Sequence, residues 1–134
     1  ISNSIVVGTG NKVEDFGIGF YTKYGDGGVD ISPVADLMKS EVFELSKHLK
    51  INDDILNAPP TDGLWDDDRN DEDQIGVSYK DLEKIMLRLE KGEDPKGFSN
   101  KIKSYYEIYM GHHNANKHKM VEIPVCKIPS KLKL

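Results

Sequence analysis

The stretch GFYTKYGDGGVDISP, residues 19–33, holds four glycines, one lysine and two aspartates, begins with Gly-Phe-Tyr and ends in a proline. It is too polar to form part of a hydrophobic core. Glycines such as Gly27 and Gly28 let backbone amides approach an anion without a Cβ in the way. The Gly-rich region extends over residues 10–32, and an irregular stretch of this length inside a compact domain is usually functional or disordered. Its aromatic residues favour a functional loop that binds a ligand.

A strand is expected directly before this loop. SIVVGTG, residues 4–10, is a β-branched run that ends in glycines, which is typical of a buried strand in a parallel sheet. Ligands bind at the carboxyl ends of such strands, where Thr9 falls, although a plain turn without a ligand fits this run equally well. The pattern therefore predicts an α/β fold in which helices flank a parallel sheet.

Helices are expected after the loop. Pro33 suits a first helical turn, and the residues that follow share an apolar face at helical spacing: Val34, Leu37, Met38, Val42, Leu45 and Leu49. Lys39 lies away from that face and is a solvated surface lysine unless a motif assigns it a role. Further helices are predicted from Ser78, capped together with Asp81, and from about Ser99, so the C-terminal portion should be mainly helical.

The segments between and after these helices are polar. Residues 57–76 form an acidic loop, which we expect to be mobile over residues 62–74 and to close over a bound ligand. It is not a calcium loop of the EF-hand type, because Asp71 and Val77 stand where that loop needs Gly and Glu. The tail from residue 121 carries two prolines and should wrap the surface.

Composition narrows the class of protein. The chain has 134 residues, a net charge of −5 and 37% hydrophobic residues, which suits one globular domain and argues against a nucleic-acid-binding protein. No apolar run approaches the roughly 18 residues of a membrane span. The single cysteine, Cys126, fits a reducing cytosol, so we expect a cytoplasmic protein. Because a strand-like run follows the first residues at once, without an initiator Met, we also expect more chain before it.

Four blocks, taken in order, resemble the synthetase domain of NAD synthetases: GTGNKVED, FYTKYGDGGVDISPVADLMKSEV, APPTDGLWDDDRNDEDQIGVSY and a late His-Lys pair. The resemblance implies a Rossmann-like ATP-pyrophosphatase fold (adenine nucleotide alpha hydrolase-like), of which residues 1–134 would be the C-terminal part of a single domain. The family's SGGxDS phosphate loop belongs to the N-terminal part and is absent from these residues.

The same resemblance implies an ATP-dependent ligase that requires Mg²⁺. ATP adenylates the nicotinate carboxylate of deamido-NAD and releases pyrophosphate, and ammonia then displaces AMP to give NAD. We expect the ammonia-dependent form and a homodimer, with no nucleic-acid or membrane partner. Two alternatives stay open: another ligase of the ATP-pyrophosphatase superfamily, such as a GMP synthetase, and a non-catalytic nucleotide-binding fragment.

Site residues follow from the resemblance motif by motif. It assigns ATP binding to Thr9, Lys39 and Thr61, a magnesium ligand to Glu14, and deamido-NAD binding to Lys23, Asp30, His118 and Lys119. It assigns the catalytic role to Asp26, because an ammonium ion must lose a proton to a nearby carboxylate before it can attack. A lysine in the first turns of a helix, as predicted for Lys39, also lies where the helix dipole favours phosphate.

Overall fold

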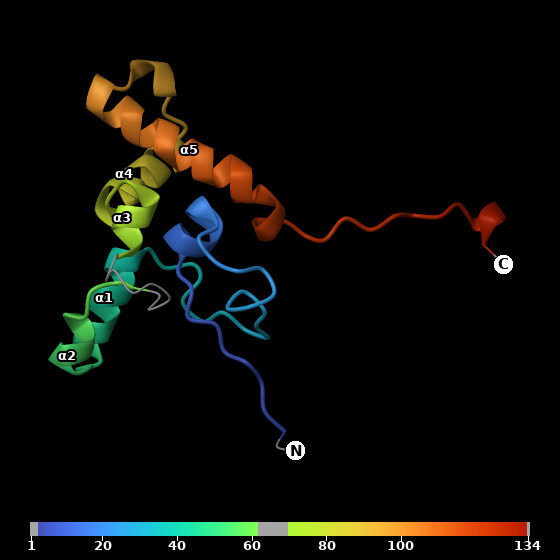
Figure 1. Cartoon of the computed structure of the whole chain (residues 1–134), viewed down its shortest axis with the longest axis horizontal. Helices are drawn as coiled ribbons and strands as arrows, with labels where there is room; N and C mark the ends of the chain where they lie inside the picture. The colour runs from blue at the N-terminus through green and yellow to red at the C-terminus, as the bar shows by residue number, and fades with distance from the viewer. Residues whose placement is uncertain (1–2, 62–69, 134) are drawn as a thin grey trace.

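The computed structural model describes residues 3–61 and 70–133, and helices dominate it. In order, the elements are η1 (Lys12–Ile18), α1 (Lys39–His48), α2 (Asp53–Leu56), α3 (Asp71–Ile75), α4 (Tyr79–Glu90), η2 (Pro95–Gly97), α5 (Asn100–Met120) and η3 (Ser130–Leu132). Figure 1 shows α5 running past α4 and η1, with α1 and α2 together on one side. Among these described helices, none combines the length and the apolar character that a bilayer crossing requires.

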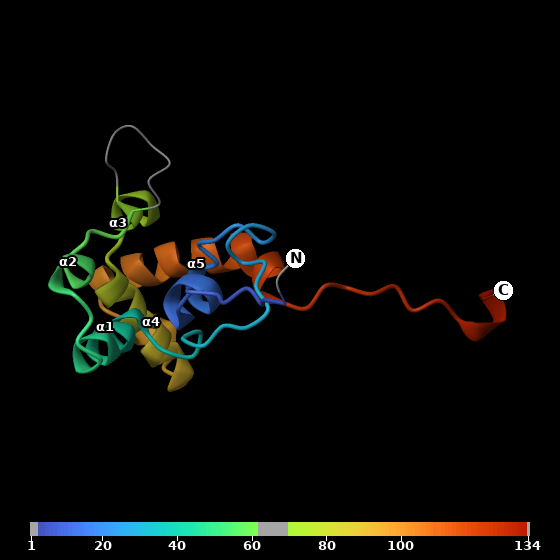
Figure 2. The same ribbon diagram turned by 90° about the horizontal axis from the view of Figure 1, so that it is seen from below.

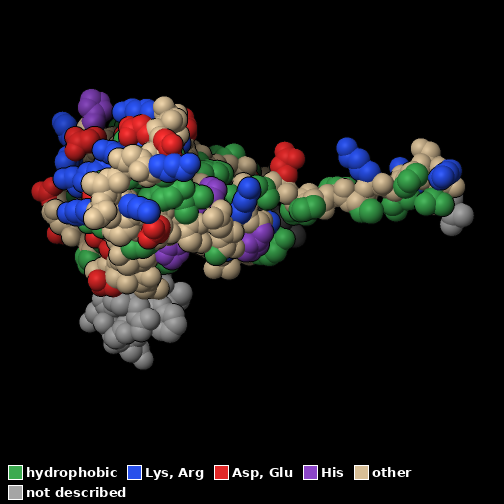
Figure 3. All heavy atoms as spheres, turned by 90° about the horizontal axis from the view of Figure 1, so that it is seen from above, with side chains coloured by type: hydrophobic (Ala, Val, Ile, Leu, Met, Phe, Trp, Pro, Cys, Tyr) green, Lys and Arg blue, Asp and Glu red, His purple; other side chains and the backbone are tan. Residues whose placement is uncertain are grey.

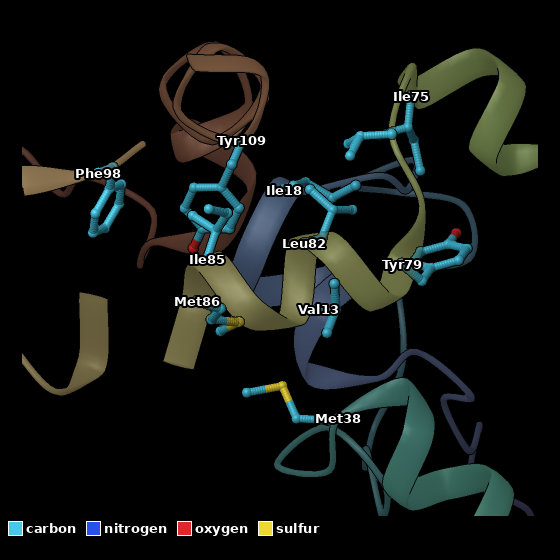
Figure 4. Packing of buried hydrophobic residues seen from close by; sticks show 11 residues of the cluster. Val13, Ile18, Met38, Ile75, Tyr79, Leu82, Ile85, Met86, Phe98 and Tyr109 are labelled. Carbon is cyan, nitrogen blue, oxygen red and sulfur yellow. The ribbon is translucent and has the colours of Figure 1, made fainter. Parts of the chain in front are cut away.

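The core forms where η1 packs against both α4 and α5. The side chains buried completely are Val13 and Ile18 from η1, and Leu82 and Ile85 from α4. Tyr109 of α5 closes the cluster, as Figure 4 shows. Burial of one such aliphatic side chain contributes roughly 1.5–3 kcal/mol, so this small cluster holds the loop after η1 against the long helix α5.

The predicted helix starts at Ser78 and Ser99 are confirmed. The Ser78 hydroxyl accepts a hydrogen bond from the Asp81 N–H at 3.2 Å, and α4 begins at the next residue. Helix α5 begins directly after Ser99 and buries Tyr109 among partly buried aromatic neighbours. The C-terminal portion is therefore mainly helical, as predicted.

The predicted parallel sheet is not seen in the described residues, which contain no strand. Val7 forms an isolated parallel bridge with Ile31, supported by a hydrogen bond from the Gly8 N–H to the Ile31 carbonyl at 2.8 Å. The pairing direction agrees with a parallel sheet. A sheet needs partners on both sides of its strands, however, and Ile5, Val6 and Val7 remain more than half exposed here.

The prediction of a helix from Pro33 is wrong in its start and in its buried face. Helix α1 begins at Lys39, because the extended Met38 (ψ 156°) interrupts the preceding turns and the Leu37 carbonyl accepts from the Lys12 N–H. Of the predicted apolar face only Met38 is buried, while Leu45 and Leu49 are exposed. Lys39 does lie in the first turn of a helix, as expected.

The acidic loop and the tail also differ from expectation. Of the segment expected to be mobile, residues 62–69 lie outside the described residues, whereas Asp71–Ile75 forms α3, capped by Asn70. The tail does not wrap the surface, because residues 121–133 are all exposed. Figure 2 shows it leaving the end of α5, and Figure 3 shows hydrophobic side chains along it.

Candidate functional site

The Gly-rich loop is a tight turn stabilised by its own backbone and by Asp26. The Thr22 carbonyl accepts hydrogen bonds from the N–H groups of Gly25 and Gly27, both at 3.0 Å. The Asp26 Oδ1 accepts from the Thr22 N–H at 2.8 Å, and Asp26 itself is exposed at the turn. A Cβ on Gly27 would lie 2.5 Å from the Tyr21 ring, so only glycine fits there. The conformation that presents Asp26 thus depends on the glycine pattern.

The C-terminal end of α5 holds this loop in place. The Lys119 ammonium donates to the carbonyl oxygens of Gly19 at 2.9 Å and Tyr21 at 2.7 Å. The Lys23 ammonium donates to the His118 carbonyl at 2.5 Å. In Figures 1 and 2 the loop lies beside the end of α5 in both views. These bonds join residues almost one hundred positions apart in the sequence.

Two adjoining pockets open where the loop meets α5. One, of about 600 Å³, is lined by Lys23, His118 and Lys119 among others. The second, of about 430 Å³, is lined by Lys23, Lys119 and Asp30. The two share the walls Tyr21, Lys23, Tyr24, Lys119 and Ile123. The four residues assigned to deamido-NAD by resemblance therefore each line one or both of these pockets, which together we call the hollow between the Gly-rich loop and α5.

Asp30 has a structural role in addition to its position at the pocket. Its Oδ2 accepts from the Val6 N–H at 2.7 Å, and its own N–H donates to the Val6 carbonyl at 2.9 Å. These two bonds hold the end of the loop against the extended segment before Gly8. Asp30 thus joins the pocket wall to the segment that carries Thr9.

A second cluster lies where η1 meets α1 and α4. Asn11 caps η1: its Oδ1 accepts from the N–H groups of Val13 and Glu14, both at 3.1 Å, and its Nδ2 donates to Glu14 Oε2 at 2.5 Å. The other oxygen of Glu14 is paired with the ammonium of Lys39. Glu14, assigned to the metal, and Lys39, assigned to ATP, thus contact each other although 25 positions separate them.

Lys39 also lines a pocket of about 660 Å³ between α1, α4 and Pro60. Thr61 follows Pro60 directly and is exposed. Thr9 is exposed in the turn between the bridge residue Val7 and η1, and it does not line the three pockets described here. Of the three residues assigned to ATP, Lys39 therefore lines this pocket and Thr61 follows one of its lining residues, Pro60.

Two ionisable groups near this cluster are perturbed. Burial raises the pKa of the Asp15 carboxyl to about 6, and the negative charges of Glu14 and Asp26 add to the shift. Burial likewise raises the pKa of the Tyr79 hydroxyl, with Glu14 and Asp71 as the next causes. The negative charge of Glu14 thus contributes to both shifts.

The fit of Mg²⁺ to this cluster can be judged from its oxygen donors. Mg²⁺ typically binds one or two protein carboxylates together with substrate phosphates. Glu14 offers one carboxylate beside a lysine suited to phosphate. Within residues 3–61 and 70–133, no group of three or more His, Cys, Asp or Glu side chains forms a cage for a metal ion. The residues present fit a metal that is shared with a polyphosphate, and they do not fit a site made of protein ligands alone.

Sequence reasoning missed three residues of this cluster. Asn11 is the N-cap of η1, and asparagine is a preferred N-cap residue, so its residue type could have predicted a helix start there. Tyr79 and Glu83 of α4 contact the first two residues of α1. Their spacing of one helical turn, which places them on the same face of α4, is the only feature of the sequence that indicates a shared role. The short helix η1 was not predicted either, because Gly17 interrupts its apolar pattern.

The chain is similar in sequence to known proteins. The family model described as NAD synthase matches residues 1–122. The NH(3)-dependent NAD(+) synthetase of Methanococcoides burtonii is 48% identical over 89 residues, which is 66% of this chain and 33% of that protein. The protein of the same name from Syntrophomonas wolfei is 37% identical over 131 residues, which is 98% of this chain and 48% of that protein.

A solved structure matches as well. The structure of NMN synthetase from Francisella tularensis has a TM-score of 0.70 and 35% identity, covering 96% of this chain and 48% of that chain. The chain thus spans about a third to a half of the length of the relatives that it matches.

Proposed function

The chain belongs to the NAD synthase family, and on this premise we propose that the protein of which it forms a part amidates deamido-NAD to NAD at the expense of ATP. The nicotinate carboxylate attacks the α-phosphorus of ATP, and the bond to pyrophosphate breaks. Ammonia then attacks the adenylated carbonyl carbon, loses a proton, and expels AMP. Membership of this family removes the alternative of another ATP-pyrophosphatase ligase such as a GMP synthetase.

The observation that carries this proposal is the hollow between the Gly-rich loop and the end of α5. Lys23, Lys119, Asp30 and His118 line its two pockets, which together suit an anionic dinucleotide. The ammonium groups of Lys23 and Lys119 supply positive charge for phosphates. Tyr21 and Tyr24 in the same walls supply aromatic surface on which a base or pyridine ring can stack.

The cluster around Lys39 is the proposed site for the phosphates of ATP. Lys39 lies in the first turn of α1, where the helix dipole also favours an anion. Thr61 and Thr9 are the further proposed contacts. Glu14 would hold Mg²⁺ together with the phosphate oxygens, and the ion would neutralise the charge of the polyphosphate. The Glu14–Lys39 pair would open as the carboxylate turns to the metal and the ammonium to the phosphates.

Asp26 is the proposed base for the ammonia step. Asp26 is exposed at the turn of the loop, and the next residue, Gly27, lines the smaller of the two pockets. Because one carboxylate oxygen already accepts from the Thr22 N–H, the other is the candidate acceptor for the proton of ammonium. An aspartate suits this position because one oxygen stabilises the turn while the other can accept the proton.

The remaining proposals concern the whole protein. The complete fold would be the Rossmann-like ATP-pyrophosphatase fold, in which the exposed segment Ile5–Val7 joins a parallel sheet with further strands. We also propose a homodimer, supported by exposed apolar residues such as Phe43, Leu49 and Ile55. A cytoplasmic location agrees with the single exposed cysteine, Cys126.

A second substrate is favoured by one specific comparison. The structure of NMN synthetase from Francisella tularensis matches 96% of this chain at 35% identity. Nicotinate mononucleotide carries the same carboxylate as deamido-NAD and lacks only the adenylate half. The chemistry at Asp26 and Lys39 would therefore be the same, and the substrates would differ in how much of the hollow they fill.

The test is a direct comparison of the two substrates with the whole protein. Purified protein is supplied with ATP, Mg²⁺ and ammonium, and either deamido-NAD or nicotinate mononucleotide, and formation of the amide is measured by chromatography. A higher kcat/KM for deamido-NAD supports the first proposal, and a higher kcat/KM for the mononucleotide supports the second. If the folded protein forms neither amide, both proposals are wrong.

A further inference from the structure

Tyr79 is held rigidly at the start of α4. Its side chain lies in the core with 5% of the residue exposed. Its hydroxyl donates to the Asp71 Oδ2 at 3.1 Å, and its backbone N–H donates to the Glu72 Oε1 at 2.7 Å. Both acceptors belong to α3. The ring of Tyr79 therefore has little freedom to turn, and it offers one face to α1.

The ammonium of Lys39 lies over that face, 3.9 Å from the centre of the ring. In the described part of the chain, the other lysine–tyrosine pairs are longer, at 5.6 Å for Lys119–Tyr21, 5.8 Å for Lys101–Tyr105 and 6.0 Å for Lys23–Tyr24. Attraction between a cation and a ring quadrupole strengthens at short range and when the cation is shielded from water. The side chain of Lys39 is only 19% exposed, and its distance to the ring is the shortest of the four, so we expect its contact with Tyr79 to be the strongest.

Helix α4 also holds the backbone beside Lys39. Glu83, one turn after Tyr79 and 8% exposed, accepts from the Ser40 N–H at 2.8 Å and from the Ser40 hydroxyl at 2.7 Å. The same face of α4 thus fixes the first turn of α1 through Glu83 and the end of the lysine side chain through Tyr79. Neither residue has a role in the assignments made by resemblance.

We propose that Tyr79 is a positioning residue that holds the Lys39 ammonium at the site of the ATP phosphates. In the structure Lys39 has a second contact, Glu14, which is also the proposed magnesium ligand. If the carboxylate of Glu14 turns to a metal, the lysine loses that partner. The neutral ring keeps the ammonium in place without cancelling its charge, so the charge stays available to phosphate.

Because this role rests on the proposed function of Lys39, the experiment measures both residues in the whole protein. Pyrophosphate release is followed while ATP is varied at saturating Mg²⁺, ammonium and dinucleotide. Tyr79→Phe keeps the ring, and its KM for ATP should stay within about twofold of the parent value. Tyr79→Leu removes the ring, and its KM for ATP should rise about 3- to 30-fold, the range expected for a cation–ring contact. The KM for the dinucleotide should change little, because Tyr79 does not line those pockets.

Tyr105→Leu is the matched control, since Tyr105 also packs on the core beneath a lysine but lies on α5 away from Lys39. It should leave the KM for ATP unchanged. In a Lys39→Ala background, Tyr79→Leu should raise that KM no further, because the ring acts through the lysine. If Tyr79→Leu does not fold, as judged by circular dichroism, Tyr79→Met takes its place as the variant without a ring.

The two levels of proposal fail in different ways. If Lys39→Ala leaves the KM for ATP unchanged, the phosphate role of Lys39 is wrong and the role of Tyr79 is wrong with it. If Lys39→Ala raises the KM but the folded Tyr79→Leu does not, only the positioning role is overturned. An equal rise in the Phe and Leu variants would also overturn it, because the hydroxyl and not the ring would then be responsible.

Discussion

Tyr21 and Lys119 are hydrogen-bonded to each other in both directions. The Tyr21 hydroxyl donates to the Lys119 carbonyl at 2.6 Å, and the Lys119 ammonium donates to the Tyr21 carbonyl at 2.7 Å. The ammonium also lies 5.6 Å from the centre of the Tyr21 ring. This reciprocal pair fixes the start of the Gly-rich loop on the last turn of α5, and both residues line the two pockets proposed for the dinucleotide.

Loss of the Lys119 ammonium should weaken binding of the dinucleotide. Lys119→Met keeps the length and apolar stem of the side chain but removes the charge and its bonds to Gly19 and Tyr21. Charged hydrogen bonds of this kind contribute about 1.5–3 kcal/mol, so the KM for the dinucleotide should rise roughly 10- to 100-fold. Steady-state kinetics of the whole protein measures this, with the KM for ATP as the internal control. An unchanged KM for the dinucleotide would remove Lys119 from the site.

Asp26→Asn should separate the two steps of the reaction. An amide oxygen can still accept from the Thr22 N–H, so the turn should persist, whereas the proton acceptor is lost. Adenylation, followed as pyrophosphate release in a single turnover, should be nearly normal, while amide formation should slow about 10²- to 10⁴-fold. Higher pH should restore part of the rate by supplying free ammonia.

Asp26→Ala is the companion variant, because it removes the base and the bond to Thr22 together. It should impair dinucleotide binding in addition to amide formation. If Asp26→Asn slows both steps equally and higher pH restores neither, Asp26 supports the loop and is not the base.

Asp81 should contribute to stability in a pH-dependent way. A hydrogen bond from Lys84 is the main cause that lowers the pKa of its carboxyl, and the Ser78 hydroxyl adds to it. A carboxyl whose pKa is lower in the folded state stabilises the protein above its ordinary pKa, near 4, and loses that effect as the pH falls. Asp81→Asn should therefore lower the free energy of unfolding by about 0.5–1 kcal/mol at pH 7.

The difference between Asp81→Asn and the parent should shrink as the pH falls from about 4 towards 2, which urea unfolding at several pH values will show. Glu44→Gln is the control at the same spacing, because Glu44 pairs with Lys47 in a bridge that is largely exposed. It should change stability very little at any pH. A pH-independent loss in Asp81→Asn would contradict the assigned cause.

A polypeptide of residues 1–134 alone should make no NAD. It offers one proposed metal carboxylate, Glu14, and it leaves Ile5, Val6 and Val7 more than half exposed. Incubation with ATP, Mg²⁺, ammonium and deamido-NAD should give no amide above a no-protein control. Turnover close to that of the whole protein would show that these residues form a complete site.

Local features of the sequence determined much of the helical part. Ser78 and Ser99 predicted the starts of α4 and α5, and at Ser78 the reason is a side-chain cap, which acts on the next three residues and needs no distant partner. The apolar spacing of Leu82 and Ile85 predicted the buried face of α4 for the same reason. The order of the motifs, read along one chain, also sufficed to indicate the family, which the match over residues 1–122 confirms.

Tertiary structure decided the start of α1 and the absence of strands from the described residues. The Leu37 carbonyl accepts a hydrogen bond from the Lys12 N–H instead of continuing a helix from Pro33. Local sequence pattern cannot predict a bond to a residue so far away in the chain. Ile5 to Val7 have the composition of a strand, yet a strand forms only beside neighbours in space. The contacts of Lys39 with Glu14 and Tyr79, and of Lys119 with Tyr21, likewise exist only because η1 packs against α4 and α5. The sequence by itself determined which residues carry charge and where α4 and α5 begin, whereas packing determined where α1 begins and which of those charges meet.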